Sequence, residues 1–468
     1  MANDFRIEHD FLGEKEISNN DYYGVQTLRA LENFHISGVG LNTYPPIIKA
    51  LGEVKLACAK ANYDLGLLTD EQIKAMTAAC EEVIAGKLDN QFTVDMIQGG
   101  AGTSTNMNAN EVIANRAIEL MGHKKGEYDY CHPNNHVNLS QSTNDAYPTA
   151  MGLALVYHSE ILVEALKLAV KSFRNKAVEF KDVIKMGRTQ LQDAVPMTLG
   201  QEFEVYAYTL ETEIARIENN VSLNLQVNLG GTAIGTGINS EPGYSELAVK
   251  HLKAITGRNT TLAPNLIEAT QDTSSFVTFS STLKRLAIKL SKICNDLRML
   301  GSGPKTGLLE INLPKMQPGS SIMPGKVNPV IPEVVNQVCF KVIGNDLTVT
   351  MAAEAGQLEL NVMEPVMVAA LFESVQMLKN ALDTLRLRCV DGITANAEHC
   401  RDMVNHSIGI VTALNPLLGY EKCSWLAKAA LDTGKSVYDL VLEQNFLSKD
   451  KLDEALKPEN MLAPKPMK

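Results

Sequence analysis

The sequence has few aromatic residues and no long apolar run. Phe, Trp and Tyr make up 6% of its 468 residues, and there is a single tryptophan. No uninterrupted apolar stretch reaches the roughly 20 residues that a membrane-spanning helix needs, so we expect no membrane association. Residues 1–16 contain acids and no apolar core segment, which argues against a secretory signal. The cytoplasm is therefore the default expected location.

Positive charge is also scarce. The chain has 43 Lys and Arg against 54 Asp and Glu, for a net charge of -11. This balance argues against a nucleic-acid-binding surface, although it leaves room for a local basic pocket that takes a small acidic metabolite. With 45% apolar and 21% charged residues, the composition is typical of a soluble, helix-rich globular protein.

Cysteine is uncommon, and no two cysteines are in a Cys-x-x-Cys spacing. Eight cysteines in a chain of this length indicate reduced core residues rather than a disulfide framework. Cys131, His132 and His136 form the only cluster with ligand-like elements. No fourth ligand lies nearby, so a polar loop is favoured over a zinc site.

Sustained seven-residue periodicity is the main structural signal that is present. Apolar residues spaced alternately by three and four are typical of long helices that pack nearly parallel in a bundle. At about 1.5 Å per residue, thirty-residue helices span about 45 Å, which suggests packing against further copies of the chain. Strand-like alternation is scarce, so we predict an all-α fold. The stripes are Leu283, Leu286, Leu290, Ile293, Leu297 and Leu300; Phe203, Ala207, Leu210, Ile214, Ile217 and Val221; and Leu371, Val375, Leu378, Leu382, Leu385 and Cys389.

The length predicts about three domains. We expect a mainly helical N-terminal domain at 1–141, a central domain of long helices at 142–396, and a small helical C-terminal domain at 397–468. The last boundary rests on a change to shorter amphipathic segments after about residue 396.

The segment Gly319–Pro329 places two hydroxyls, a lysine and an amide on a loop rich in glycine and proline. Backbone amides near Ser320 and Ser321 could converge on a carboxylate, with Lys326 adding charge and Asn328 adding a donor and an acceptor. A loop of this kind binds anions and can close over a site.

This loop admits two other interpretations. Its resemblance to a phosphate-binding P-loop is superficial, because five residues rather than four separate Gly319 and Gly325, and Val327 stands where Ser or Thr should hold magnesium. We reject the nucleotide-binding interpretation. An ordinary Gly/Pro-rich connection between helices remains open.

Three further segments, 99–111, 140–145 and 187–196, are polar where each leads into an expected helix. In the first, Thr103 or Ser104 could cap the helix. The second precedes a helix expected to begin near Pro148. Capping alone is the simpler explanation for any one segment. It needs one group per helix, however, whereas each segment carries several, with few carboxylates to repel an anion.

The chemistry that such a pocket could perform is limited by the groups it lacks. The segments contain no obvious paired carboxylates, no Cys/His pair and no metal cage, which disfavours hydrolysis by an activated thiol or zinc. Hydroxyls, amides and one lysine suit proton abstraction beside a carboxylate, because preorganised donors stabilise the developing second negative charge.

The loop and the three polar segments resemble the characteristic blocks of the aspartase/fumarase superfamily. The match extends from Tyr22 to about Pro416, nearly the whole chain. Ser142-Thr143-Asn144 resembles the ammonia-lyase form, since fumarases usually have Ser-Ser-Asn there. The blocks Gln190–Pro196 and Gly356–Pro365 point the same way, because the second ends in Met-Glu-Pro where fumarases tend to have Phe-Lys-Pro.

The resemblance implies reversible deamination of L-aspartate to fumarate and ammonia through an aci-carboxylate, without a prosthetic group. It gives Ser320 the role of the base that takes the C3 proton, and Ser321 a role in holding the resulting dianion. The other positions implied to bind substrate are Thr103, Ser142 and Thr143 at the β-carboxylate, and Asn144, Thr189, Gln190, Lys326 and Asn328 around the α-carboxylate and amine.

Gln190 departs from the commoner pattern of the superfamily. Many members carry a histidine there, paired with the glutamate that matches Glu333. Because glutamine does not titrate, a proton relay between these two positions is in doubt. The segment His132–Asn135 resembles a second carboxylate site of fumarases, with Asn135 in place of an acid.

The superfamily fold implies a three-domain, all-α subunit whose helices form the twenty-helix core of a homotetramer, with each active site shared by three subunits. Activation by divalent cations also occurs among such proteins, but the sequence offers no dedicated ligand set. Two alternatives stay open: class II fumarase-type hydration of fumarate to malate, and a catalytically silent structural protein on this scaffold.

Overall fold

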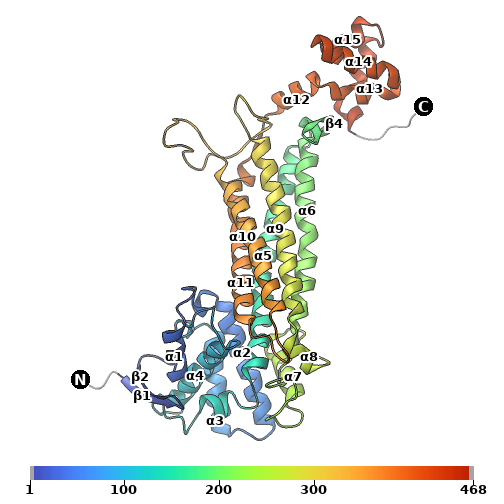
Figure 1. The fold of residues 1–468 in the computed structure, drawn as a ribbon. Coiled ribbons are helices and arrows are strands. Elements are labelled where there is room, and N and C mark those ends of the chain that lie inside the picture. The colour runs from blue at the N-terminus through green and yellow to red at the C-terminus, as the bar shows by residue number, and fades with distance from the viewer. Residues whose placement is uncertain (1–4, 463–468) are drawn as a thin grey trace. The chain divides into compact units, whose positions relative to one another are not determined.

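The computed structural model describes residues 5–462 and is predominantly helical, as predicted (Figure 1). Residues 1–4 of the expected N-terminal segment and 463–468 of the expected C-terminal domain lie outside the described part. No helix within 5–462 is both long and apolar enough to span a membrane. The longest helices are α5 (Thr143–Glu179), α6 (Leu199–Ser222), α9 (Ser274–Leu300), α10 (Val330–Glu354) and α11 (Glu364–Arg388).

The chain folds into two compact units, and the long helices contribute to both. The first unit contains residues 1–163, 215–287 and 340–378, and the second contains 164–214, 288–339 and 379–468. The three domains predicted from the sequence divide the chain differently and stay a prediction.

The first unit contains a small hairpin and several helices beside its segments of the long helices. Its further elements are β1 (Phe5–Asp10), β2 (Gly13–Ser18), α1 (Val25–Asn33), η1 (Leu41–Thr43), α2 (Pro45–Asp64), α3 (Asp70–Ile84), η2 (Asp89–Gln91), α4 (Thr103–Leu120), the π-helical turn η3 (Pro133–Val137), η4 (Leu223–Leu225), β5 (Gln226–Val227), α7 (Tyr244–Thr256), β6 (Thr261–Leu262) and α8 (Leu266–Gln271).

The second unit contains a longer hairpin and a group of short C-terminal helices around their own apolar core. That core includes Ile184 and Met186 of the hairpin together with Leu414, Leu426 and Leu452. The elements are β3 (Ile184–Thr189), β4 (Gln192–Thr198), β7 (Ile311–Asn312), η5 (Val390–Gly392), β8 (Thr394–Ala395), α12 (Ala397–His406), η6 (Ile408–Ile410), α13 (Val411–Leu418), α14 (Tyr420–Thr433), α15 (Val437–Glu443), α16 (Lys449–Ala455) and α17 (Pro458–Met461).

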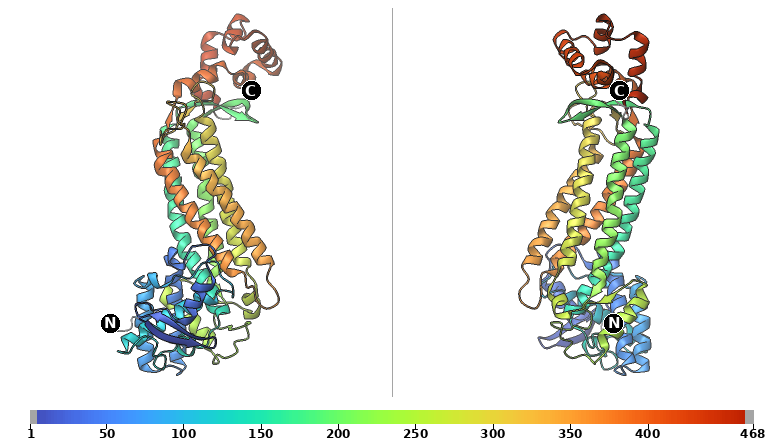
Figure 2. Two further views of the ribbon diagram at one scale, coloured as in Figure 1. Left: turned by 60° about the vertical axis from the view of Figure 1, so that its left-hand side comes forward. Right: turned by 90° about the vertical axis from the view of Figure 1, so that its right-hand side faces the viewer.

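The predicted seven-residue stripes form the inner faces of the long helices, which run side by side (Figure 2). The stripe from Leu283 to Leu300 on α9 is at most 5% exposed at every position, and the stripe from Leu371 to Cys389 at most 1%. Of the stripe residues on α6, only Ile214 is half-buried, and the others are buried. All eight cysteines are buried and unpaired, as predicted. Burial of these stripes accounts for the near-parallel packing.

Polar side chains fix the order of the helices within the first unit. Ser280 of α9 donates to Asp346 of α10 (2.9 Å), and Asn345 of α10 donates to Ser374 of α11 (3.0 Å). Next along, the ring of His158 on α5 lies 3.1 Å from Gln376 of α11. Because buried polar groups require partners, these pairs hold the helices in one register.

Helix α5 begins at Thr143, five residues earlier than predicted, and Pro148 lies inside it. Ser142 Oγ accepts from Asn144 N (3.2 Å), and Asp145 Oδ1 accepts from Ser142 N (2.9 Å). These two reciprocal bonds cap the N-terminus of the helix. Pro148 has no N–H for the carbonyl of Asn144. Asn228 Nδ2 supplies that hydrogen bond instead, at 2.9 Å, which explains why proline is tolerated here.

The segment 187–196 lies in a β-hairpin, which the sequence analysis did not predict. Strands β3 and β4 pair antiparallel, with Thr189 opposite Gln192. Gln190 (φ 53°) and Leu191 (φ 61°) form the two-residue turn. Such turns require positive φ at both central residues and usually contain glycine or asparagine, so this sequence gave no hairpin signal.

Candidate functional site

The first unit brings together the hydroxyls and amides at the start of α5. Thr143 Oγ1 accepts from Asn106 Nδ2 of α4 at 3.2 Å. Asn144 Nδ2 donates to the carbonyl of Ala233 at 2.8 Å. Together with the capping bonds of Ser142, these contacts position all three side chains, none of which is fully buried. Because Asn106 occupies an acceptor position on Thr143, the Thr143 hydroxyl hydrogen is free to donate to a ligand.

A buried lysine lies beneath this cluster. Lys55 of α2 is fully buried, and its ammonium donates to Asn106 Oδ1 (2.7 Å), Gln141 Oε1 (2.8 Å) and Asn138 Oδ1 (3.1 Å). Burial lowers the pKa of Lys55 to about 8. The Asn106 side chain contacts both Lys55 and Thr143. The positive charge of Lys55 therefore polarises the amide that donates to the Thr143 hydroxyl, which would meet an anion.

Asp145 fixes the opposite side of the cluster. Its carboxylate is fully buried and accepts from the backbone N–H groups of Ser142, Gly230 (3.0 Å) and Thr232 (2.9 Å). Burial raises its pKa to about 6, although these donors and Lys55 act in the opposite direction. The loop around residue 230 is therefore tied to the N-terminus of α5.

Thr103 is the first residue of α4, and neither it nor Ser104 caps the helix as expected. The N-cap is Gly102, at φ 92°, and it provides no side-chain hydrogen bond. A side chain there would collide with the ring of Tyr147, since a Cβ would lie 2.6 Å from it. Thr103 Oγ1 instead donates to the carbonyl of Gly100 at 2.7 Å. Gln98 Oε1 caps the helix instead, because it accepts from the backbone N–H of Thr105 at 3.0 Å.

In the second unit, the loop of Ser320 closes on itself. Gly319 N donates to the carbonyl of Lys326, and Asn328 Nδ2 donates to the carbonyl of Gly319, both at 2.7 Å. A Cβ on Gly319 would lie 2.7 Å from the backbone nitrogen of Asn328, so only glycine permits this closure. Gly325 has φ 84° and turns the chain at the far end.

Ser320 Oγ accepts two backbone N–H groups, from Met323 at 3.0 Å and from Ile322 at 3.2 Å. Donors aimed at a hydroxyl oxygen favour its deprotonated form. Ser321 and Lys326 are exposed, and neither side chain makes a hydrogen bond or ion pair within the described residues. The loop therefore holds the oxygen of Ser320 while presenting the other two groups to solvent.

The hairpin of the second unit places Thr189 and Gln190 at its exposed tip. Its base is held by Glu310, which is fully buried between Lys185 (2.7 Å) and Arg188 (2.6 Å). Lys185 also pairs with Glu202 of α6. These ion pairs stiffen the strands that carry the two tip residues.

Each unit thus gathers a part of the predicted site. The first holds Ser142, Thr143 and Asn144 in one network, with Thr103 at the start of α4. The second holds Thr189 and Gln190 on the hairpin tip, and the remaining predicted residues on the loop at 319–328.

The supporting residues Lys55, Asn106 and Asp145 were not predicted from the sequence. One signal was available for Lys55, because it lies within the otherwise apolar run from Val54 to Ala59 of a helix. A charged residue in such a run is seldom fully buried without a role.

The cluster of Cys131, His132 and His136 noted in the sequence lies at a tight turn. His132 Nδ1 accepts from the backbone N–H groups of Asn134 (3.0 Å) and Asn135 (3.2 Å), and His136 Nδ1 accepts from His132 N at 2.8 Å. Both Nδ1 atoms are therefore engaged in shaping the turn. Within the described residues, no group of three or more His, Cys, Asp or Glu side chains is placed to hold a metal ion.

Similarity to known proteins identifies the family of this chain. The family described as lyase matches residues 13–344, and the fumarase C C-terminus matches residues 410–463. The chain belongs to the aspartase/fumarase superfamily of lyases. Among superfamily members, the aspartate ammonia-lyase of Helicobacter pylori is 60% identical over 98% of both chains. The aspartate ammonia-lyase of Escherichia coli is 56% identical over 99% of this chain and 97% of its own length.

Solved structures of the superfamily show the same fold. A fumarate lyase:delta crystallin protein from Brucella melitensis superposes with a TM-score of 0.96 at 54% identity, covering 98% of this chain and 100% of that one. A class II fumarase from Schistosoma mansoni gives 0.90 at 36% identity, covering 98% and 99%. The long-helix architecture is therefore that of the superfamily, and the protein is a carbon–nitrogen lyase by its relatives.

Proposed function

We propose that this protein catalyses the reversible deamination of L-aspartate to fumarate and ammonia. The observation that carries the proposal is its 56–60% identity, over nearly the full length, to aspartate ammonia-lyases from several bacteria. The hydroxyl and amide network around α5 supports it, since it offers donors to a carboxylate without a competing acid on the same surface.

Ser320 is the proposed base. Its oxygen would take the C3 proton of aspartate, giving the aci-carboxylate, and ammonia would then leave C2. A free serine hydroxyl is a very weak base, so its anion must be stabilised. The two N–H groups that Ser320 Oγ accepts supply part of this stabilisation. Lys326 would supply the rest once the loop closes over substrate and excludes water.

The substrate carboxylates have separate proposed partners. Thr103, Ser142 and Thr143 would bind the β-carboxylate, where the second negative charge develops, with Lys55 beneath them adding a positive field. Asn144, Thr189, Gln190 and Asn328 would surround the α-carboxylate and amine. Ser321 would help to hold the dianion.

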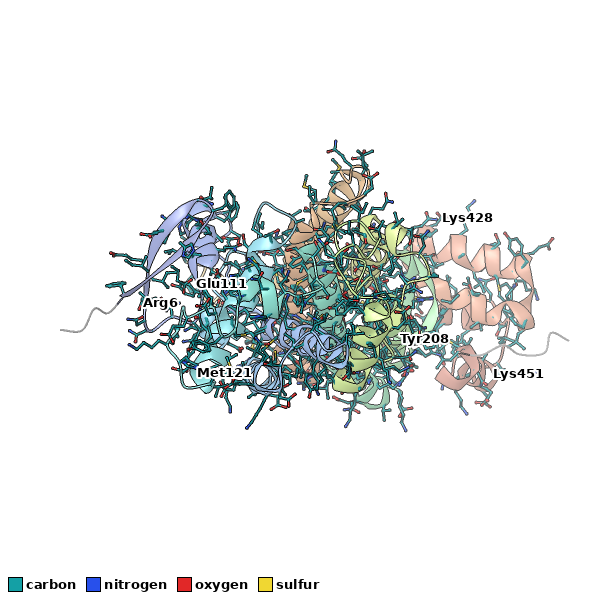
Figure 3. The ribbon with its side chains drawn as sticks, turned by 90° about the horizontal axis from the view of Figure 1, so that it is seen from below. Arg6, Glu111, Met121, Tyr208, Lys428 and Lys451 are labelled. Atoms are coloured by element: carbon teal, nitrogen blue, oxygen red, sulfur yellow. The ribbon has the colours of Figure 1, made fainter. Side chains whose placement is uncertain are left out.

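A homotetramer with active sites shared by three subunits is part of the proposal. Large apolar side chains on the surface of α10 support it: Phe340 and Leu347 are each 62% exposed and Met351 is 60% exposed. Tyr208 on α6, labelled in Figure 3, is also 62% exposed. Exposed apolar residues at helical spacing are typical of a face that packs against another chain. Light scattering should give four times the 51.1 kDa mass of the chain.

We further propose that the reaction needs no prosthetic group and that the protein acts in the cytoplasm. Eight unpaired, buried cysteines suit a reducing compartment. Activation by a divalent cation can be tested by adding Mg²⁺ after treatment with a chelator.

One assay decides between deamination and hydration. The absorbance of fumarate should rise with L-aspartate, and should fall with fumarate plus ammonium but not with fumarate alone. A fall without ammonium would indicate hydration to malate. No change in any arm, with a folded tetramer, would indicate a silent structural protein.

A further inference from the structure

A cavity of about 230 Å³ lies within the first unit, beside the predicted substrate residues of α5. It is lined by the second turn of α5, the segment 223–228, the end of α8, the start of α9 and Glu364, the first residue of α11. Asn228 in its wall donates to the carbonyl of Asn144. The cavity therefore adjoins the backbone of a residue placed at the substrate amine.

Two buried acceptors in this cavity lack donors. Glu364 is 6% exposed, and its carboxyl makes no hydrogen bond or ion pair within the described residues. Asn224 is also 6% exposed, and its Oδ1 is a buried oxygen without any hydrogen-bond partner. Its Nδ2 is already used, donating to the carbonyl of Val221 at 3.1 Å. Both groups need a donor that the chain does not supply.

Glu364 cannot easily turn away from the cavity. Asn361 Oδ1 accepts from Met363 N at 2.8 Å, while Asn361 Nδ2 donates to the carbonyl of Ala352 at 3.0 Å. These bonds join the end of α10 to the start of α11 and fix the turn that carries Glu364. A glutamate in a first helical turn is favoured by the helix dipole, but that preference does not require its burial.

The mouth of the cavity is negatively charged. Glu268 and Asp272 line it and are exposed, whereas no Lys, Arg or His is among the lining residues. Burial raises the pKa of Glu364 to about 8, and burial together with this carboxyl raises the pKa of Tyr147 on α5. The site consequently lacks a cation rather than an anion.

We propose that this cavity binds an ammonium ion, with Glu364 and Asn224 Oδ1 as its principal acceptors. An ammonium ion carries four N–H donors and one positive charge, so it satisfies both groups at once. Water could donate to Asn224 but would leave Glu364 protonated, whereas an ammonium ion compensates the charge of the deprotonated carboxylate. This inference rests on the proposed function, in which ammonium is the product, and it assigns ammonium a binding site beside the catalytic centre.

Thermal unfolding tests the binding without reference to activity. The full-length protein is heated in 100 mM NH₄Cl, KCl or NaCl, alongside Glu364→Gln and the control Glu246→Gln. Glu246 lies on the exposed surface of α7 and does not line the cavity, so its substitution makes the same side-chain change elsewhere. Ammonium should raise Tm by about 2 °C more than sodium in the wild type and the control, and this difference should vanish in Glu364→Gln.

Three outcomes would overturn the proposal: equal effects of ammonium and sodium on the wild type, equal effects of ammonium and potassium, or retention of the ammonium effect in Glu364→Gln. Equality with potassium would make the cavity a general monovalent-cation site. Should Glu364→Gln fail to fold, Asn224→Ala in the same series replaces it, with the same expected loss.

Kinetics in the direction of fumarate amination provide a second readout. Glu364→Gln should raise KM for ammonium about five-fold, while KM for fumarate changes less than about two-fold, because only the ammonium contact is lost. Equal changes in both constants would contradict the assignment. A wild type with no lyase activity that still shows the ammonium-specific rise in Tm would refute the proposed function and leave the site standing.

Discussion

The polar cluster at the start of α5 and the loop of Ser320 contain similar side chains, but they differ in how these are held. In the cluster, Ser142, Thr143 and Asn144 all make hydrogen bonds to other parts of the first unit or to their own helix end. In the loop, Ser320 and Asn328 bond only within the loop itself. The exposed side chains of Ser321 and Lys326 in the same loop have no partner among residues 5–462.

This difference suggests a division of labour. A region that binds a carboxylate gains from donors fixed before the ligand arrives, because they need no reorganisation as charge develops. A region that performs chemistry under exclusion of water must open to admit substrate, so few bonds should tie it to the surrounding structure. Substitutions in each region can test whether the cluster is fixed before the ligand arrives and whether the loop opens to admit substrate.

The largest effect is expected at Ser320. Ser320→Ala should lower kcat by about 10³-fold, because it removes the proposed base, while a bound dicarboxylate such as succinate should retain its affinity within a few fold. Fumarate absorbance gives kcat, and calorimetry gives the affinity. Ser321→Ala serves as the neighbouring control and should reduce kcat less. Near-normal turnover in Ser320→Ala would refute the assignment.

Replacing the two lysines separates the regions most directly. Lys55→Met should destabilise the protein by about 3 kcal/mol, since it leaves the buried amide oxygen of Asn106 and the half-buried amide oxygen of Gln141 without their donor. It should also raise KM for fumarate through Thr143. Lys326→Met should change stability by less than about 0.5 kcal/mol, because Lys326 is exposed and unpaired, yet it should lower kcat.

Urea unfolding and steady-state kinetics on the same two variants provide the measurement. The proposed difference between the cluster and the loop would be refuted if Lys55→Met unfolded at the wild-type urea midpoint. It would also be refuted if Lys326→Met destabilised the protein as strongly as Lys55→Met.

The sequence predicted what local patterns can encode. The stripe from Leu283 to Leu300 follows from spacing alone, and the dense hydroxyls of 142–144 led to the prediction of a ligand site there. Lys55 could not be paired with Gln141 in the same way, because 86 residues separate them and only the tertiary fold brings them together. The β3–β4 hairpin escaped detection because its turn, Gln190-Leu191, has neither of the residues that usually mark it.

The start of α5 shows the same limit on a smaller scale. Pro148 was a reasonable place for a helix to begin, since proline is favoured in the first turn. The helix starts earlier because Asn228, 80 residues away, replaces the hydrogen bond that proline cannot donate. Long-range compensation of this kind leaves no mark in the local sequence.

A pH effect should distinguish the buried acid of the first unit from the exposed loop. Burial raises the pKa of Glu364 to about 8, above its ordinary value of 4.5. Between these values the folded protein retains a proton that the unfolded chain has released, so stability falls as pH rises through this window. The slope attributable to Glu364 is up to about 1.4 kcal/mol per pH unit.

Unfolding in urea from pH 5 to 8, without ammonium salts, measures this slope. Glu364→Gln should show a shallower decline than the wild type, whereas Lys326→Met should follow the wild-type curve. Identical slopes in the wild type and Glu364→Gln would show that this carboxyl does not remain protonated in the folded state.

The smallest effect is expected at the hairpin tip, where local backbone strain can be relieved without touching a substrate residue. Leu191 has φ 61° and is 67% exposed, so it gains little from burial while bearing the cost of a left-handed conformation. Leu191→Gly should stabilise the protein by about 1 kcal/mol, seen as a higher urea midpoint. Leu191→Ala is the matched control, because it removes the side chain but keeps the Cβ and should not gain this amount. If Leu191→Gly lowers activity while it raises stability, the strained turn itself positions Thr189 and Gln190. Rigidity in the second unit then extends from the ion pairs of Glu310 to the hairpin tip.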